Sequence, residues 1–155
     1  MRKRASVFIL GVLFLGVAVS GACQETLRQA KIIEVQGRVF VRQGKKKWTE
    51  AKENMVLNSG DVIKTQRHSS ALININGSGE TATVEVSENS QLLLSKLIED
   101  QNKGTQDTLL DLAIGKVLIE AEKLHSEESK FEVKTPTSIV GVRGTTFAVE
   151  VEAIE

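Results

Sequence analysis

The chain has 155 residues, a length that suits one domain with a modest hydrophobic core. Its net charge is zero; because three of the 20 basic residues lie at positions 2–4, the rest of the chain carries 17 basic against 20 acidic residues. That balance leaves no basic excess to neutralise phosphates and argues against nucleic acid as the main partner. The single cysteine, Cys23, excludes an internal disulfide.

Residues 1–22 have the order of a secretory signal peptide. The basic head at 2–4 precedes the apolar run Val7 to Val19, and small residues follow at 20–22. We therefore expect a helical signal segment that is cleaved after Ala22. The alternative is an uncleaved anchor, because the stretch before Cys23 is just long enough to span a thin bilayer. Both interpretations predict export, to the periplasm or outer envelope.

Cys23 is a candidate lipidation site. Gly21, Ala22 and Cys23 resemble the cleavage site of bacterial lipoproteins, in which the cysteine after the leader is acylated and becomes the mature N-terminus. Ser20 departs from that pattern, since a large aliphatic residue usually stands there. Cleavage by an ordinary signal peptidase near Ala22 is the alternative. We expect residues 23–30 to be a tether and residues 31–155 to be the domain.

The first predicted strands form a hairpin. Ile33 and Val35 precede the turn signal at Gly37, and Val39 and Val41 follow it, each alternating with polar or mixed residues. This period of two is typical of strands with one apolar face.

A basic segment and the only tryptophan follow this hairpin. Lys45, Lys46 and Lys47 indicate either a solvated hairpin tip, the favoured interpretation, or a polyanion site. Trp48 is interpreted as a plug at the edge of the core, with a ligand platform as the alternative.

Turn signals divide the middle of the chain into short strands. Asn58 to Asp61 and Asn76 to Gly79 are predicted turns, and branched residues alternate on both sides of them. Residues 92–97 continue as a strand or begin a helix, which periodicity alone does not decide. The polar residues 100–108 predict a mobile insertion.

The last third of the chain also favours strands. Gly115 interrupts the helical pattern of residues 109–121, so a strand, a turn and a second strand are predicted there. A charged loop at 125–130 precedes the segment from Phe131 to Pro136 and an alternating strand at 147–151. The sequence therefore predicts an all-β fold of short antiparallel strands, arranged as a roll, a sandwich or an irregular β-solenoid.

After residue 36, a set of turn and core residues follows an order that is also found in a known family. The set comprises Gly37, Val39, Trp48, Leu57, Gly60, Asp61, Ile63, Thr65, Ser70, Ala71, Ile73, Asn76, Gly77, Ser78, Leu110, Gly115, Val117, Phe131, Val133, Thr135, Pro136, Val140, Val142, Arg143, Gly144, Thr145, Phe147 and Val149. This order resembles the FecR domain of bacterial cell-surface signalling regulators. Its most specific part is the closing segment from Phe131 to Val149, which contains Val142-Arg143-Gly144-Thr145.

The resemblance implies an extracytoplasmic, non-catalytic domain. Regulators of the family also have a cytoplasmic sigma-factor-binding region, a membrane span and a receptor-binding region; this sequence has no region before its leader, so we expect it not to signal to a sigma factor alone. The favoured function is binding of a protein or glycan partner in the envelope. The alternative is an accessory sensor that modulates a separate regulator or transporter. We expect Gly60, Asp61, Gly144 and Thr145 to be structural rather than ligand contacts.

The sequence offers no catalytic or metal-binding constellation. His68 and His125 stand in no triad-like or ligand-like setting, and the acids at 127, 128 and 132 lie in or beside the charged loop. Gly77 to Gly79 is too short to be a phosphate cradle. We therefore predict no enzyme, no cofactor and no metal, and a hydrolase with an unrecognised site is the least favoured alternative.

Overall fold

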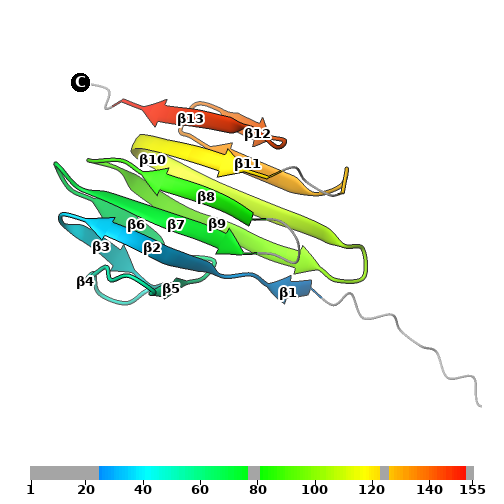
Figure 1. The fold of residues 1–155 in the computed structure, drawn as a ribbon, viewed down its shortest axis with the longest axis horizontal. Coiled ribbons are helices and arrows are strands. Elements are labelled where there is room, and N and C mark those ends of the chain that lie inside the picture. The colour runs from blue at the N-terminus through cyan, green and yellow to red at the C-terminus, as the bar shows by residue number, and fades with distance from the viewer. Residues whose placement is uncertain (1–24, 77–80, 123–125, 153–155) are drawn as a thin grey trace, which may run out of the picture.

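The protein folds into one strongly curled β-sheet, a half-barrel (Figure 1). The computed structural model describes residues 25–76, 81–122 and 126–152. The strands are β1 (Glu25–Leu27), β2 (Ala30–Gln36), β3 (Val39–Arg42), β4 (Thr49–Glu50), β5 (Val56–Leu57), β6 (Val62–Thr65), β7 (Ser70–Asn76), β8 (Thr81–Val86), β9 (Gln91–Asp100), β10 (Thr105–Ala121), β11 (Lys130–Lys134), β12 (Ile139–Val142) and β13 (Thr146–Val151).

The prediction of an all-β fold is confirmed for the described residues. Residues 1–22, where the helical signal segment is predicted, lie outside them, as do Cys23, Gly77 and His125. Within the described part of the chain, no helix is long and apolar enough to cross a membrane.

The curled sheet forms two facing layers that share β10. Layer A has the strand order β4-β3-β6-β9-β10-β11-β12, with β1 paired beside β9. Layer B has the order β5-β2-β7-β8-β10-β13. The first half of β10, up to Ile114, pairs in layer A, and the half from Gly115 onward pairs in layer B.

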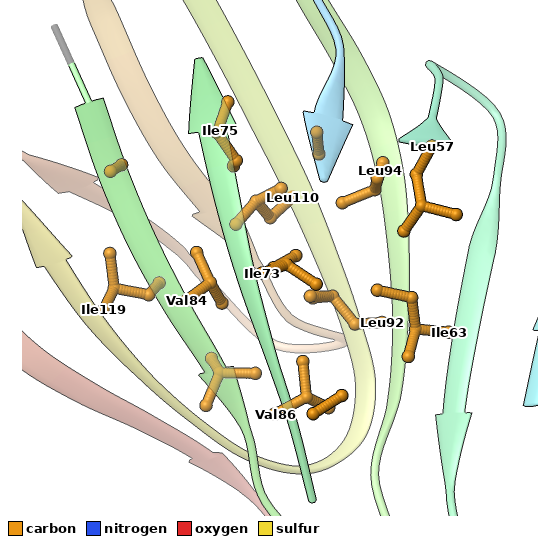
Figure 2. Packing of buried hydrophobic residues seen from close by; sticks show 14 of the residues in the cluster. Leu57, Ile63, Ile73, Ile75, Val84, Val86, Leu92, Leu94, Leu110 and Ile119 are labelled. Carbon is orange, nitrogen blue, oxygen red and sulfur yellow. The ribbon is translucent and has the colours of Figure 1, made fainter. Parts of the chain in front are cut away.

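The core lies between the two layers (Figure 2). Alternate residues of several strands, such as β3, β7 and the first half of β10, point inward, as a half-buried pleated sheet requires. Aliphatic side chains dominate, and the largest of those that are fully buried are Ile32, Leu57, Ile63, Ile73, Ile75, Leu92, Leu94, Leu97, Leu110, Leu112 and Ile119.

β10 is one continuous strand of 17 residues rather than the predicted strand, turn and strand. Gly115 has a φ of 94°, and this left-handed residue bends β10 where it passes from layer A to layer B. Gly115 does mark an irregularity in the strand, as the sequence indicated. However, β10 continues through it as a bent strand and does not end in a turn.

The predicted hairpin around Gly37 is wrong, because β2 and β3 lie in different layers. β2 pairs with β7 and β5, whereas β3 pairs with β6 and β4. Gly37, with a φ of 71°, turns the chain from layer B to layer A. A Cβ at this position would lie 2.7 Å from the carbonyl oxygen of His68, so the corner has no room for a side chain.

The inward face of β2 also differs from the prediction. Ile32 is fully buried, whereas Ile33, predicted to face the core, is 46% exposed. The pairing of β2 with β7 shifts register between Ile32 and Glu34, and such a bulge reverses which residues point inward.

The predicted tether is part of the sheet from Glu25 onward. β1 pairs with the last residues of β9, and Ala30 is fully buried. Between them, the buried side chain of Arg28 donates from Nε to the carbonyl oxygen of Asn76 (3.0 Å) and from Nη1 to Oγ1 of Thr108 (2.9 Å). These bonds join the start of the fold to both layers, since Asn76 ends β7 and Thr108 belongs to β10.

The predicted mobile insertion at 100–108 is instead a hairpin. β9 and β10 pair directly from Asp100 and Thr105, so only residues 101–104 form the turn. A further difference concerns direction: β11 runs parallel to the first half of β10, whereas antiparallel strands were predicted. The chain leaves β10 in layer B and returns to layer A before β11 begins, which gives the two segments the same direction.

Candidate partner-binding edge

Apart from Gly37 at the corner between β2 and β3, the predicted family-motif residues that the structure describes gather at two opposite edges of the fold. Trp48, Gly60 and Asp61 lie near the N-terminal edge, which we define by β1, β4 and β5 along the lower side of Figure 1. The C-terminal edge, defined by β12 and β13 along the upper side, holds the second group. That group consists of Thr135, Pro136, Arg143, Gly144, Thr145 and Phe147.

Asp61 is a buried carboxylate that holds two loops. Its Oδ1 accepts the backbone N–H of Gly44 at 2.9 Å, and its Oδ2 accepts that of Asn58 at 2.8 Å. Asp61 is 4% exposed, and its own carbonyl oxygen accepts the N–H of Leu94 in β9. Gly60 makes this turn possible with a φ of 90°. Both oxygens are engaged by backbone, so we propose that Asp61 is structural.

Trp48 lies at the surface rather than in the core. It is 39% exposed, and the guanidinium of Arg42 stands 5.1 Å from the ring centroid, a cation–π distance. The preceding Lys45, Lys46 and Lys47 are exposed in the turn between β3 and β4, as predicted for a solvated tip.

Thr135 and Pro136 form a tight turn between β11 and β12. Oγ1 of Thr135 accepts the N–H of Ser138 at 3.0 Å, and the Thr135 N–H donates to the Ser138 carbonyl at 2.8 Å. The side chain of Thr135 thus closes the turn, and Pro136 restricts the residue before it to an extended conformation. The turn places the next residues, Ile139–Val142, beside β11.

Arg143, Gly144 and Thr145 carry the chain from β12 in layer A to β13 in layer B. Gly144 has a φ of 64°, and the carbonyl of Thr145 accepts the N–H of Ala121 at 3.4 Å. Phe147 then packs half-buried against the core. The side chain of Arg143 is 64% exposed and lies 3.6 Å from Oε1 of Glu127, which is itself 95% exposed.

β12 is an edge strand with an open side. Among the described residues it pairs with β11 alone. Because Thr135 and Ser138 form a hydrogen-bonded pair, the antiparallel alternation makes Val140 and Val142 bond to β11. The N–H and C=O groups of Ile139 and Gly141 then point away from β11. These are the groups that an added strand would bond.

The side chains of β12 suit an added strand as well. β12 contains no charged residue and no proline; Ile139 is 63% exposed and Val140 is 36% exposed. β4 and β5, at the opposite edge, have two residues each, which blocks pairing with another chain. The protein thus protects one edge of its sheet and leaves the other open.

Two hollows lie near the ends of β12, one beside the turn that precedes it and one that includes its last two residues. One of about 470 Å³ lies between the turn 135–138, Ala113 and Ile114 of β10, and residues 149–152 at the end of β13. A smaller one of about 260 Å³ lies between residues 129–132 and 141–143. Strand-addition sites take alternate side chains of the added peptide into such hollows. Sequence reasoning missed this site, although an uncharged segment between Pro136 and Arg143 was visible.

The described residues bring no set of three His, Cys, Asp or Glu side chains within reach of one metal ion. His68, one of the two histidines, is 78% exposed and lies 3.8 Å from Glu88.

Comparison with known proteins supports the resemblance found in the sequence. No curated protein and no solved structure matches the chain. A family model described as FecR protein matches residues 61–154, which is more than half of the 155 residues. The match runs from Asp61, through the turn at Thr135, to the strand after Gly144. The chain belongs to the FecR family.

Proposed function

We propose that the protein is an exported, non-catalytic module of the bacterial cell envelope that binds an extended segment of a partner protein along β12. The observation that carries this proposal is the open, uncharged edge of β12, with the outward backbone groups of Ile139 and Gly141. Main-chain hydrogen bonds to an added strand would supply affinity, and the two hollows near the ends of β12 would supply specificity.

The family supports the non-catalytic part of this proposal. FecR proteins are regulatory and not enzymes, and FecR-like domains are typically extracytoplasmic. The leader pattern of residues 1–22 supports export of this chain independently of the family.

The charges around β12 indicate the chemistry of the partner segment. Lys134 ends β11 and lies 3.5 Å from Oδ2 of Asp111, Arg143 stands directly after β12, and both cations are exposed. A surface ion pair such as that between Arg143 and Glu127 contributes little, so this cation remains able to pair with a ligand. The fitting partner is an extended, β-branched segment flanked by acidic residues. A glycan partner is the alternative.

Gly141→Pro is expected to weaken binding of such a segment and leave the fold intact. Proline removes the outward N–H of residue 141, which bonds no other strand in the free protein, and proline is tolerated at such edge positions. Peptides selected from a phage-displayed library on the wild-type protein are expected to lose at least about tenfold in affinity, the worth of one or two such bonds.

Gly141→Ala is the matched control. It keeps the N–H, and a Cβ at this position meets no atom within 4 Å, so selected peptides should bind it as they bind the wild type. Peptides that bind Gly141→Pro equally well would contradict strand addition. Selection of cell-wall glycans but no peptides would favour the glycan alternative, and self-association lost in Gly141→Pro would identify a second copy as the occupant.

A second candidate function is that of an accessory regulator, and the regulatory character of the family favours it. In that case the partner segment belongs to a separate regulator or transporter. Deleting the gene should then change the output of a sigma-factor reporter in the same cell, and Gly141→Pro should reproduce the deletion. An unchanged reporter would argue for a purely structural partner.

Anchoring through Cys23 has its own test. If the cysteine is acylated, cells grown with radiolabelled palmitate should label the protein, and Cys23→Ser should remove the label completely. Mass spectrometry of the mature N-terminus measures cleavage and acylation together. Labelling that persists in Cys23→Ser would rule out this anchor, and a mature chain beginning elsewhere would indicate ordinary signal-peptide cleavage.

A further inference from the structure

We propose that the N-terminal edge docks on an anionic phospholipid surface through the lysine loop, residues 43–48, with Trp48 in the membrane interface. This surface lies across the fold from β12, so the two proposals concern separate parts of the molecule (Figure 1).

The lysine loop is held in place by the fold. Gln43 donates from Nε2 to the carbonyl oxygen of Val56 at 3.1 Å, and the N–H of Gly44 donates to Asp61 at 2.9 Å. A bond from Lys46 N–H to the Gln43 carbonyl, at 3.1 Å, closes the turn. The start of the loop is therefore fixed to two neighbouring segments of the fold, and the three lysines are exposed to solvent.

Apolar side chains accompany the lysines at this edge. Trp48 is 39% exposed and Val56, joined to the loop through Gln43, is 41% exposed. Leu27 in β1 is 70% exposed. Tryptophan favours the boundary between headgroups and acyl chains, because its ring is apolar and its indole N–H is polar. Trp48 beside exposed lysines matches the composition of a membrane-contacting surface.

The charge of the loop is opposite to that of the chain around it. Residues 42–53 contain five basic residues against the acids Glu50 and Glu53, whereas the chain after the leader pattern carries 17 basic and 20 acidic residues. The local positive charge of the loop is complementary to an anionic surface. The excess of acidic residues in the rest of the chain disfavours binding of anions elsewhere on the fold.

The path of the chain brings this edge to the membrane if the preceding residues are anchored, a step that rests on the proposed function. Glu25 already belongs to β1 and stands two residues after Cys23, so the connection spans at most about 7 Å. β1 is paired with β9 and cannot swing away without breaking that pairing. An anchor at or before Cys23 therefore holds the N-terminal edge against the headgroups.

Trp48 is the only tryptophan of the whole chain, so its fluorescence reports on docking directly. The full chain is reconstituted with vesicles of phosphatidylcholine alone or mixed with phosphatidylglycerol, each containing brominated lipid as a quencher. We expect quenching of Trp48 and a blue shift of its emission in the anionic vesicles only, and both should disappear at high salt because the attraction is electrostatic.

Changing Lys45, Lys46 and Lys47 together to glutamine should release the loop. Each lysine near an anionic surface is worth about a fivefold change in the docked-to-free ratio, so losing three should lower that ratio about 100-fold. The matched control changes three exposed lysines elsewhere, Lys64, Lys116 and Lys130, to glutamine and should quench as the wild type does. Circular dichroism checks that both variants are folded.

Three outcomes would overturn the proposal: equal quenching in neutral and anionic vesicles, quenching that survives the triple change in the loop, or no quenching in either lipid. Flotation of the same samples measures anchoring separately. Vesicle flotation without quenching would reject docking and leave anchoring standing, and neither result bears on peptide binding at β12.

Discussion

Gly115→Ala is expected to lower the free energy of unfolding by about 4 kcal/mol, the largest loss among single alanine substitutions outside the core. Two causes act together. The φ of 94° is unfavourable for any residue with a Cβ, and that Cβ would lie 2.5 Å from Cα and 2.6 Å from Cβ of Ser90. Ser90 is fully buried and cannot retreat, because its N–H donates to Thr65 and its Oγ accepts the N–H of Lys116.

Two other glycines separate these causes. Gly60 has a similar φ of 90° but open space around a Cβ, so Gly60→Ala should cost only about 1 to 2 kcal/mol. Gly141 has neither a positive φ nor a close neighbour, and Gly141→Ala should change stability by less than about 0.5 kcal/mol. Urea unfolding of the three variants measures the series. Equal losses for Gly115→Ala and Gly60→Ala would contradict the close packing of β10 on Ser90.

Asp61→Ala should cost about 3 kcal/mol, because it leaves the buried N–H groups of Gly44 and Asn58 without acceptors. The loss should also loosen the loop that contains Gly44. Trp48 ends that loop, so its emission is expected to shift toward that of a solvated indole before global unfolding. Urea unfolding followed at Trp48 and by circular dichroism measures both effects.

Two further variants test the cause of this loss. Asp61→Asn keeps one carbonyl acceptor but turns an amide donor toward the other N–H, so its cost should be intermediate. Asp107→Ala removes a carboxylate that lies 2.6 Å from Lys96 but is 38% exposed, and it should cost less than about 1 kcal/mol. If Asp61→Ala were as mild as Asp107→Ala, the two-loop role of Asp61 would be wrong.

Several strands were predictable from the sequence, whereas their pairing was not. Alternation identified β3, β7 and β13 because each has one buried face. A glycine such as Gly37 is equally expected in a hairpin turn and in a corner between two layers. What distinguishes the corner is the contact of Gly37 with His68 and Ser69, which are distant in sequence. Ile33 was misplaced because a bulge depends on the partner strand and leaves no local mark.

The turns of the candidate site were predictable from the sequence, whereas the unpaired edge of β12 was not. Thr135 and Pro136 were recognised as a turn because their chemistry is local. That β12 pairs with no second strand of the described part of the chain follows from the route of the chain, which moves to layer B at Gly144 and pairs β13 with β10. Whether a strand has an unpaired edge depends on the whole strand order, so no single residue in the sequence predicts it.

β10 has a consequence for the way the protein acquires its structure. Among the described strands, β10 alone pairs with both layers, with β9 in layer A and with β8 in layer B. A chain that emerges N-terminus first from a ribosome can form the pairs from β2 to β9 but cannot complete the pairing of β10 with β8 until Ala121 has emerged. The hydrogen-bonded continuity of the sheet is therefore completed only after more than three quarters of the chain is available.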